Sequence, residues 1–100
     1  MNNLDRLSKL IGLAQGAGSI VSGEELVIKA IQNHKTRLVF LAHDAAPNLT
    51  KKVTDKCNYY DIEFSTVFSA LELSVAIGRS RKVLAVTDAG FSKKMRTLMD

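Results

Sequence analysis

The sequence predicts an α/β fold, a three-layer α/β/α sandwich around a four-stranded mixed sheet. Helical and strand-like hydrophobic periods alternate in the order αβαβαβαβα, with short connections between them. The segment LVFLA at residues 38–42 is short and continuously apolar, as in a central strand covered on both faces. A length of 100 residues suits one core and is too short for two. We therefore expect a single domain over residues 1–100.

The first half of the chain predicts two helices and two strands. The opening helix has apolar residues at intervals of three and four, namely Leu4, Leu7, Leu10, Ile11 and Ala14. Glycines then break the pattern, and a short strand is expected at residues 19–21. A second helix over residues 23–33 precedes the central strand and buries Leu26, Val27, Ala30 and Ile31.

The second half predicts three helices and two strands. Pro47 fits the first turn of a helix that places Leu49, Val53 and Cys57 on one face. A strand is expected at residues 62–68, and Ser69 with Glu72 forms a capping-box signature for a helix over residues 69–77. The fourth strand is expected at residues 83–87. Asp88 caps a last helix whose inward side chains are Phe91, Met95 and Leu98.

Composition and charge narrow the class of protein. Fourteen Lys and Arg against ten Asp and Glu give a formal charge of +4, which favours a polyanionic partner such as RNA or DNA. No apolar run reaches the roughly 18 residues needed to cross a bilayer, and the start does not resemble a signal peptide. Cys57 is the only cysteine, so we expect a buried, inert thiol in a protein of the cytoplasm.

The segment GSIVSGEE, residues 18–25, has the two-glycine frame of a phosphate-binding loop. The last two positions of a phosphate-binding loop are Lys and then Ser or Thr. In this chain those positions are Glu24 and Glu25, which would repel a triphosphate. In one interpretation, Ser22 is an N-cap, Glu25 completes a capping box and no ligand is involved. In the other, free N–H groups at the helix entrance and the two acids meet base edges, while Lys29 reaches a phosphate.

The segment GRSRK, residues 78–82, is a second candidate site because it packs three cations into a glycine-led loop. An isolated loop of this kind is a solvated basic turn. If it lies beside the GSIVSGEE helix entrance, however, it is placed to clamp a nucleic-acid backbone.

His43 and Asp44 follow the central strand, at the end of the sheet where α/β proteins place ligands. Neither has a Ser or Cys nucleophile at a recognisable motif, and no metal-ligand spacing is present. We expect Asp44 to be a turn or cap residue and His43 to be partly buried. The sequence thus predicts no enzyme, no metal, no cofactor and no small-molecule substrate. A small hydrolase using Asp44 and His43 is the third and least favoured alternative, because no nucleophile accompanies them.

Four segments in order resemble a known family, the kink-turn RNA-binding ribosomal proteins typified by the archaeal large-subunit protein "seven-Ae" and its relative "thirty-e". The segments are GLAQGAGSIVSGEELVIKAI, RLVFLAHDAAPNLTKKV, FSALELSVAIGRSRKVLAV and DAGFSKKM. Together they look most like the bacterial YlxQ-type branch. The resemblance implies an α/β/α sandwich that binds a kinked RNA helix, has no enzymatic activity and is associated with ribosome components.

The resemblance also implies where RNA is bound. The family reads tandem sheared G·A pairs with a Gly-x-Asn-Glu-x-x-Lys pattern, which falls on residues 23–29. Gly23 and Lys29 match it, but Glu25 and Leu26 stand in the Asn and Glu positions. The family's loop for the extruded nucleotide falls on residues 78–82. Further departures are Ala46 in place of an acid, Ala70 in place of Lys and Ser74 in place of Gly.

The resulting hypothesis is a ribosome-associated or ribosomal-protein-like chain that binds structured, kink-turn-like RNA. The predicted RNA-binding residues are Ser22, Gly23, Glu24, Glu25, Lys29, Ile77, Gly78, Arg79, Ser80, Arg81 and Lys82. The alternative is a protein–protein interaction module of the same fold that has lost specific RNA binding. Salt-dependent RNA binding separates the two, because phosphate contacts release counterions.

Overall fold

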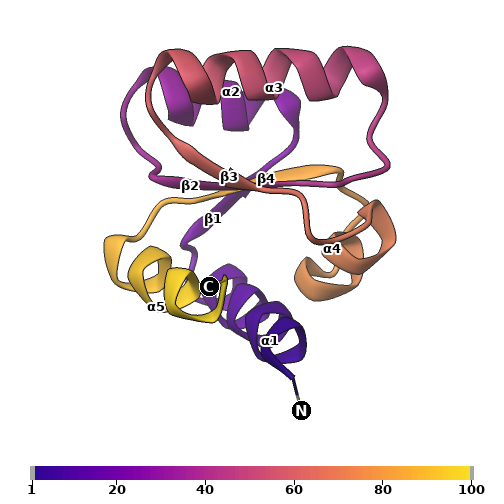
Figure 1. Cartoon of the computed structure of the whole chain (residues 1–100). Helices are drawn as coiled ribbons and strands as arrows, with labels where there is room; N and C mark the ends of the chain where they lie inside the picture. Colours follow the sequence, from indigo (N-terminus) through magenta and orange to yellow (C-terminus); the bar gives the residue numbers. More distant parts are fainter. Residues whose placement is uncertain (1, 100) are drawn as a thin grey trace.

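The computed structural model describes residues 2–99 and confirms the predicted order of helices and strands (Figure 1). The elements are α1 (Asn3–Gly16), β1 (Ile20–Ser22), α2 (Glu24–Gln32), β2 (Leu38–Leu41), α3 (Pro47–Tyr59), β3 (Glu63–Ser65), α4 (Ala70–Ile77), β4 (Val83–Val86) and α5 (Ala89–Met99). The strand predicted at residues 62–68 is shorter than expected, because only three of its residues pair with β2.

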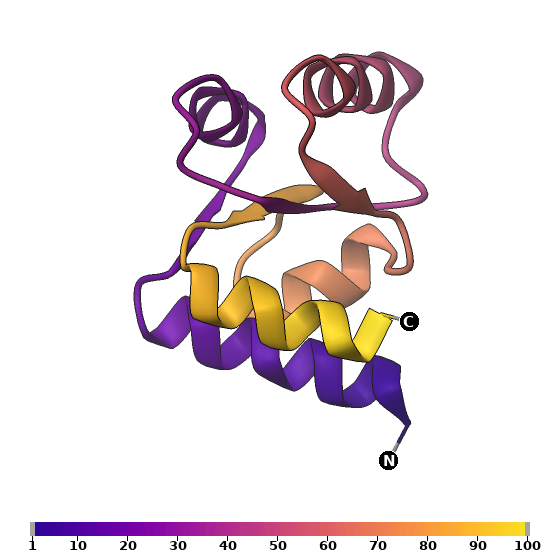
Figure 2. The same cartoon turned by 60° about the vertical axis from the view of Figure 1, so that its left-hand side comes forward.

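The four strands form a mixed sheet in the order β1-β4-β2-β3. β4 pairs antiparallel with both β1 and β2, and β2 pairs parallel with β3. Helices α2 and α3 cover one face of the sheet, and α1, α4 and α5 cover the other, as Figures 1 and 2 show. The three-layer α/β/α sandwich expected from the sequence is therefore confirmed.

The two central strands, β2 and β4, are buried at every residue. Because side chains alternate across a strand, successive residues contribute to two different cores. Leu38, Phe40, Leu84 and Val86 pack with α1, α4 and α5, whereas Val39, Leu41, Val83 and Ala85 pack with α2 and α3. This double burial explains why the sequence of both strands is continuously apolar instead of alternating.

The sheet has two ends with different connections. At the first, which we call the entrance end, β1 and β2 finish and β4 begins, as the pairing of Leu41 with Val83 shows. At the second, the far end, α2 and α3 finish and β2 and β3 begin. Helix α2 starts at the entrance end, and the 78–82 loop leads into β4 at the same end, so the fold places them together.

Candidate nucleic-acid interface

The entrance to α2 is built on Gly23, which has φ 96° and ψ 151°. This backbone region is almost restricted to glycine because a Cβ would clash with its own backbone. The Gly23 N–H donates to the Val83 carbonyl at 3.0 Å, so the turn is held against the start of β4. Gly23 therefore occupies a position that other residues take only with strain.

The first turn of α2 has no side-chain cap. The prediction that Ser22 is the N-cap with Glu25 in a capping box is therefore wrong. Ser22 is the last residue of β1 and pairs with Leu84, which takes its side chain away from the N–H groups of α2. Gly23 occupies the N-cap position instead, so the helix presents uncapped N–H groups, which favour an approaching acceptor.

Arg81 joins the basic loop to this entrance. Its Nε donates to Ser22 Oγ at 3.1 Å, and its Nη1 donates to the Ser80 carbonyl at 2.8 Å. A Cβ placed on Gly23 would lie 3.7 Å from Arg81 Nε, so the guanidinium lies directly over the turn. The condition that the sequence left open, whether GRSRK lies beside the helix entrance, is met.

Ser74 fixes the path of the 78–82 loop, a role that the sequence analysis missed. Its Oγ accepts from the Arg81 N–H at 2.9 Å, and its carbonyl accepts from the Gly78 N–H at 2.9 Å. Gly78 has φ 76° and ψ 22°, the left-handed conformation that commonly follows a helix. The sequence signal for these hydrogen bonds is a serine one helical turn before the glycine that ends the helix.

Lys52 is a second residue that the sequence did not assign to the site. Its Nζ lies 2.8 Å from Glu24 Oε2, across the gap between α3 and α2. The pair is about half exposed, so its effect is to orient the carboxylate more than to stabilise the fold. A hollow of about 540 Å³ lies beside it and is lined by Glu24, Glu25, Ile28, Lys29, Gln32 and Lys52.

The remaining predicted residues divide into exposed and buried ones. Glu25, Lys29, Gly78, Arg79, Ser80 and Lys82 are exposed. Ile77 is only 6% exposed and packs in the core with α1 and α5. Its side chain therefore does not contact a surface ligand, and its place in the site is to anchor the start of the loop.

His43 and Asp44 lie at the same end of the sheet, after β2. Asp44 Oδ1 accepts from the Ala70 N–H at 2.8 Å, so Asp44 caps α4, as the expectation of a cap residue requires. His43 is exposed, and the prediction that it is partly buried is wrong because the chain turns outward directly after Ala42. Asp88 caps α5 by accepting from the Phe91 N–H at 2.8 Å, as predicted.

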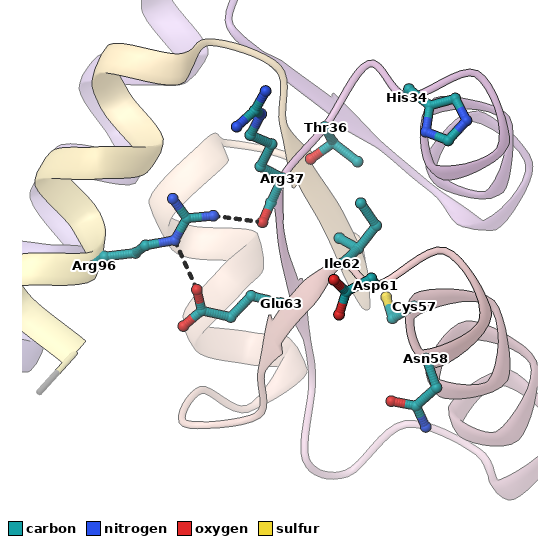
Figure 3. Close-up of a pocket in the computed structure, with 9 residues that line it drawn as sticks. All are labelled: His34, Thr36, Arg37, Cys57, Asn58, Asp61, Ile62, Glu63 and Arg96. Carbon is teal, nitrogen blue, oxygen red and sulfur yellow. Dashed lines mark hydrogen bonds and ion pairs between the residues drawn. The ribbon is translucent and has the colours of Figure 1, made fainter.

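A second polar pocket lies at the far end of the sheet and contains none of the predicted site residues (Figure 3). Arg96 reaches from α5 to close one side of it, with Nε 2.7 Å from Glu63 Oε1 and Nη2 2.9 Å from the Arg37 carbonyl. The Cys57 thiol lies in its wall and has no exposed surface, as expected for an inert cysteine, and burial raises its pKa to about 11. Within residues 2–99, no group of three His, Cys, Asp or Glu is placed to hold a metal ion.

The fold and the interface together define a class of α/β/α proteins with a glycine-built helix entrance and a basic loop at one end of a mixed sheet. The chain belongs to the Ribosomal protein L7Ae/L30e/S12e/Gadd45 family, whose model matches residues 5–96. The family resemblance inferred from the four sequence segments is therefore confirmed. No helix within the described residues is long and apolar enough to span a bilayer.

Two bacterial relatives are similar over nearly the whole chain. The RNA-binding protein YlxQ of Bacillus subtilis is 51% identical over 92 residues, which cover 91% of this chain and 92% of the relative. The RNA-binding protein YlxQ of Enterococcus faecium is 44% identical over 98 residues, covering 98% and 95%. The predicted likeness to the YlxQ-type branch is confirmed by both.

Solved structures agree with this fold. A Bacillus halodurans protein of unknown function superposes with a TM-score of 0.90 at 43% identity, covering 95% of this chain and 97% of that one. The Giardia lamblia 15.5kD RNA binding protein superposes with a TM-score of 0.82 at 18% identity, covering 95% and 82%. At that low identity the second likeness concerns the fold alone.

Proposed function

We propose that this protein binds structured RNA, with a kink-turn as the preferred form, and that it does so without catalysis. The observation that supports this most directly is the hydrogen bond from Arg81 to Ser22 at 3.1 Å. It unites an uncapped helix entrance with a basic loop, and these are two different means of holding a nucleic acid. The RNA-binding names of the two bacterial relatives support the same conclusion.

Each part of the interface has a distinct role in the proposal. The uncapped N–H groups of α2 and the carboxylates of Glu24 and Glu25 meet base edges, because carboxylates accept hydrogen bonds from base amino groups. Lys29, Arg79 and Lys82 are exposed and contact phosphates. Gly23 and Gly78 allow the RNA backbone to come close, and Ser80 lies between the two loop arginines. Arg81 both contacts RNA and keeps the loop on the entrance.

The first turn of α2 also carries Leu26, which is 54% exposed, so the prediction that the helix buries this residue is wrong. An apolar side chain at this point offers van der Waals contact to a base and no hydrogen bond. Recognition of tandem sheared G·A pairs therefore differs here from the Asn-Glu form of the family pattern. Glu25 is the residue left to accept hydrogen bonds from those bases.

We further propose that residues 1–100 act as one RNA-binding domain in the cytoplasm, on ribosomal or other structured RNA and among ribosome components. The family, which includes ribosomal proteins, supports this assignment. In this proposal the protein needs no cofactor, metal, membrane or small-molecule substrate.

The test is a titration of a kink-turn RNA into the protein at two salt concentrations, with a kink-disrupted RNA of equal length as control. We expect the kinked RNA to bind about tenfold more tightly or better. Binding should weaken as salt rises, because each neutralised phosphate releases condensed counterions. Equal, salt-sensitive binding of the two RNAs would reduce the proposal to a basic surface without shape recognition.

Single substitutions identify the residues that hold phosphates. Lys29→Ala and Arg79→Ala should each weaken binding and reduce the slope of log affinity against log salt by about one unit. Arg37→Ala is the matched control, because Arg37 is exposed at the far end of the sheet and its loss changes net charge by the same amount. If Arg37→Ala lowers the slope as much as Arg79→Ala does, the assigned interface is wrong. If neither RNA binds the unmodified protein, the protein-interaction alternative replaces the proposal.

A further inference from the structure

We propose that the groove between α1 and α5 docks an acidic amphipathic segment of a partner protein. The α1–α5 groove has a volume of about 340 Å³, and its main lining residues are Arg6, Lys9, Leu10, Leu13, Lys94 and Leu98. The two helices lie side by side in the layer on the opposite side of the sheet from α2 (Figure 2). The groove is therefore separate from the proposed RNA interface.

The fold accounts only in part for the apolar residues of the groove. Helix α1 already buries Leu7, Ile11 and Ala14 in the core, which is the single face that an amphipathic helix needs. Leu10 and Leu98 pack against the core but are only partly buried, and Leu13 is 66% exposed. A single exposed leucine is ordinary on a protein surface, but one that shares a hollow with two partly exposed leucines forms a surface suited to an apolar side chain.

The charges around the groove select the kind of partner. Among the described residues that line it, Arg6, Lys9 and Lys94 are cationic and none is acidic. The hollow continues along α5 into a second one of about 490 Å³ that includes Phe91, Lys93 and Lys94. Its one acid, Asp88, is engaged in capping α5. The whole surface is thus an apolar floor with a basic rim.

An acidic amphipathic helix has the complementary surface. Its leucines would fill the floor, and its glutamates would pair with the rim, where lysine and arginine stems also add apolar contact. A nucleic-acid backbone would satisfy the rim but leave the leucines without apolar contacts. A protein segment with both apolar and acidic side chains satisfies both parts.

The test uses a labelled synthetic peptide with leucines on one helical face and glutamates on the other positions. Its binding to the full chain is followed by fluorescence anisotropy, with a peptide of the same leucine pattern and lysines in place of glutamates as control. We expect the glutamate peptide to bind and the lysine peptide to bind about tenfold more weakly or not at all. A poly-glutamate peptide without leucines should bind as weakly as the lysine peptide.

Variants of the protein locate the binding. Leu13→Gln and Lys94→Glu should each weaken binding of the glutamate peptide by about tenfold. The first substitution removes part of the apolar floor, and the second reverses a charge of the basic rim. Leu71→Gln and Lys35→Glu are the matched controls, since Leu71 is 74% exposed on α4 and Lys35 is exposed in the turn after α2. Both controls should leave the peptide affinity unchanged, and circular dichroism should show all four variants folded.

Three outcomes would overturn the proposal. If poly-glutamate binds as well as the amphipathic peptide, only electrostatic attraction is present. If Leu71→Gln or Lys35→Glu weakens binding as much as its counterpart, the peptide binds elsewhere. If the protein sediments as a dimer that Leu13→Gln dissociates, the occupant of the groove is a second copy of this chain.

Discussion

Both ends of the sheet contain residues with positive φ, but the two ends use them differently. At the far end, His34 and Asp61 have φ 56° and 57° and follow the last turns of α2 and α3, and Gly18 has φ 75° before β1. At the entrance end, Gly23 has φ 96° before α2 and Gly78 has φ 76° after α4. The far end has large polar side chains at two of its three positions in this conformation, whereas both positions at the entrance end are glycine.

The hydrogen bonds explain the difference. At the far end, the Lys35 N–H donates to the Ala30 carbonyl at 2.8 Å, and the Ile62 N–H donates to the Cys57 carbonyl at 2.7 Å. These are ordinary helix C-caps in the left-handed region, which Asp and His also adopt. Gly23 lies in a region that is nearly closed to other residues. Positive φ alone therefore does not mark a functional site. A conformation that only glycine adopts, as at Gly23, indicates that the path of the backbone at that position matters.

The largest expected effect that tests this comparison comes from Gly23→Ala. The added Cβ has space, with its nearest neighbour in another part of the chain 3.7 Å away, so the cost comes from backbone conformation and not from a clash with that neighbour. We expect the free energy of unfolding to fall by up to about 3 kcal/mol and RNA binding to be lost, because the α2 entrance must rearrange. Chemical denaturation and the kink-turn titration measure the two effects.

Gly16→Ala is the matched control for that substitution. Gly16 is the last residue of α1, and a Cβ there meets no atom within 4 Å. Alanine is a better helix former than glycine, so this variant should be as stable as the unmodified protein or more so, with the same RNA affinity. A Gly23→Ala protein that keeps full RNA affinity would show that the entrance backbone is not part of the interface.

The second effect belongs to the far end and should change stability without changing RNA binding. Burial raises the pKa of the Cys57 thiol from 9.0 to about 11, so the folded protein holds this proton more tightly than the unfolded chain does. Below pH 9.0 both states are protonated and the thiol contributes no pH dependence. Between pH 9.0 and about 11 only the unfolded chain ionises, so stability falls as pH rises, by about 2 kcal/mol in total.

Other groups also titrate in that range, so the measurement is a difference between two proteins. The gap in unfolding free energy between the unmodified protein and Cys57→Ala should narrow by about 2 kcal/mol over this pH interval. Val53→Ala is the control, because Val53 is equally buried one turn earlier on the same face of α3 and does not titrate. For Val53→Ala, the difference in unfolding free energy from the unmodified protein should stay constant over this pH interval. If the difference for Cys57→Ala also stays constant, the pKa of Cys57 is not raised.

The sequence predicts the layers well because each element is marked by local chemistry. The apolar run at residues 38–42, Pro47 and the Ser69–Glu72 capping box each depend on neighbours in the chain, and the structure bears out all three. The prediction for Ser22 failed for a related reason. Its spacing to Glu25 fits a capping box, but pairing with β4 places β1 one residue later than predicted and puts Ser22 in the sheet.

The parts of the candidate site that the sequence did not predict depend on contacts between distant segments. Lys52 and Glu24 are 28 residues apart, and nothing in either segment indicates that α3 lies beside α2. The bond from Arg81 to Ser22 spans 59 residues and depends on β1 and β4 being neighbours. The sequence thus indicated which two segments to compare, but only the strand order brings them together.

The smallest expected effect is a gain in stability at the far end from Asp61→Gly. An L-residue in the left-handed region costs roughly 1–2 kcal/mol, and glycine avoids this at a smaller cost in unfolded-chain entropy. We therefore expect the free energy of unfolding to rise by about 0.5–1 kcal/mol, with RNA binding at the other end of the sheet retained. Asp61→Asn is the control for loss of charge, because asparagine keeps the left-handed preference and should leave stability nearly unchanged.

The reverse exchange, Gly78→Asp, places the same residue in the same conformation next to the basic loop, where it should lower both stability and RNA affinity. If Asp61→Gly and Gly78→Asp instead change RNA affinity equally, the two ends do not differ in function and the division drawn here between a binding end and a capping end fails.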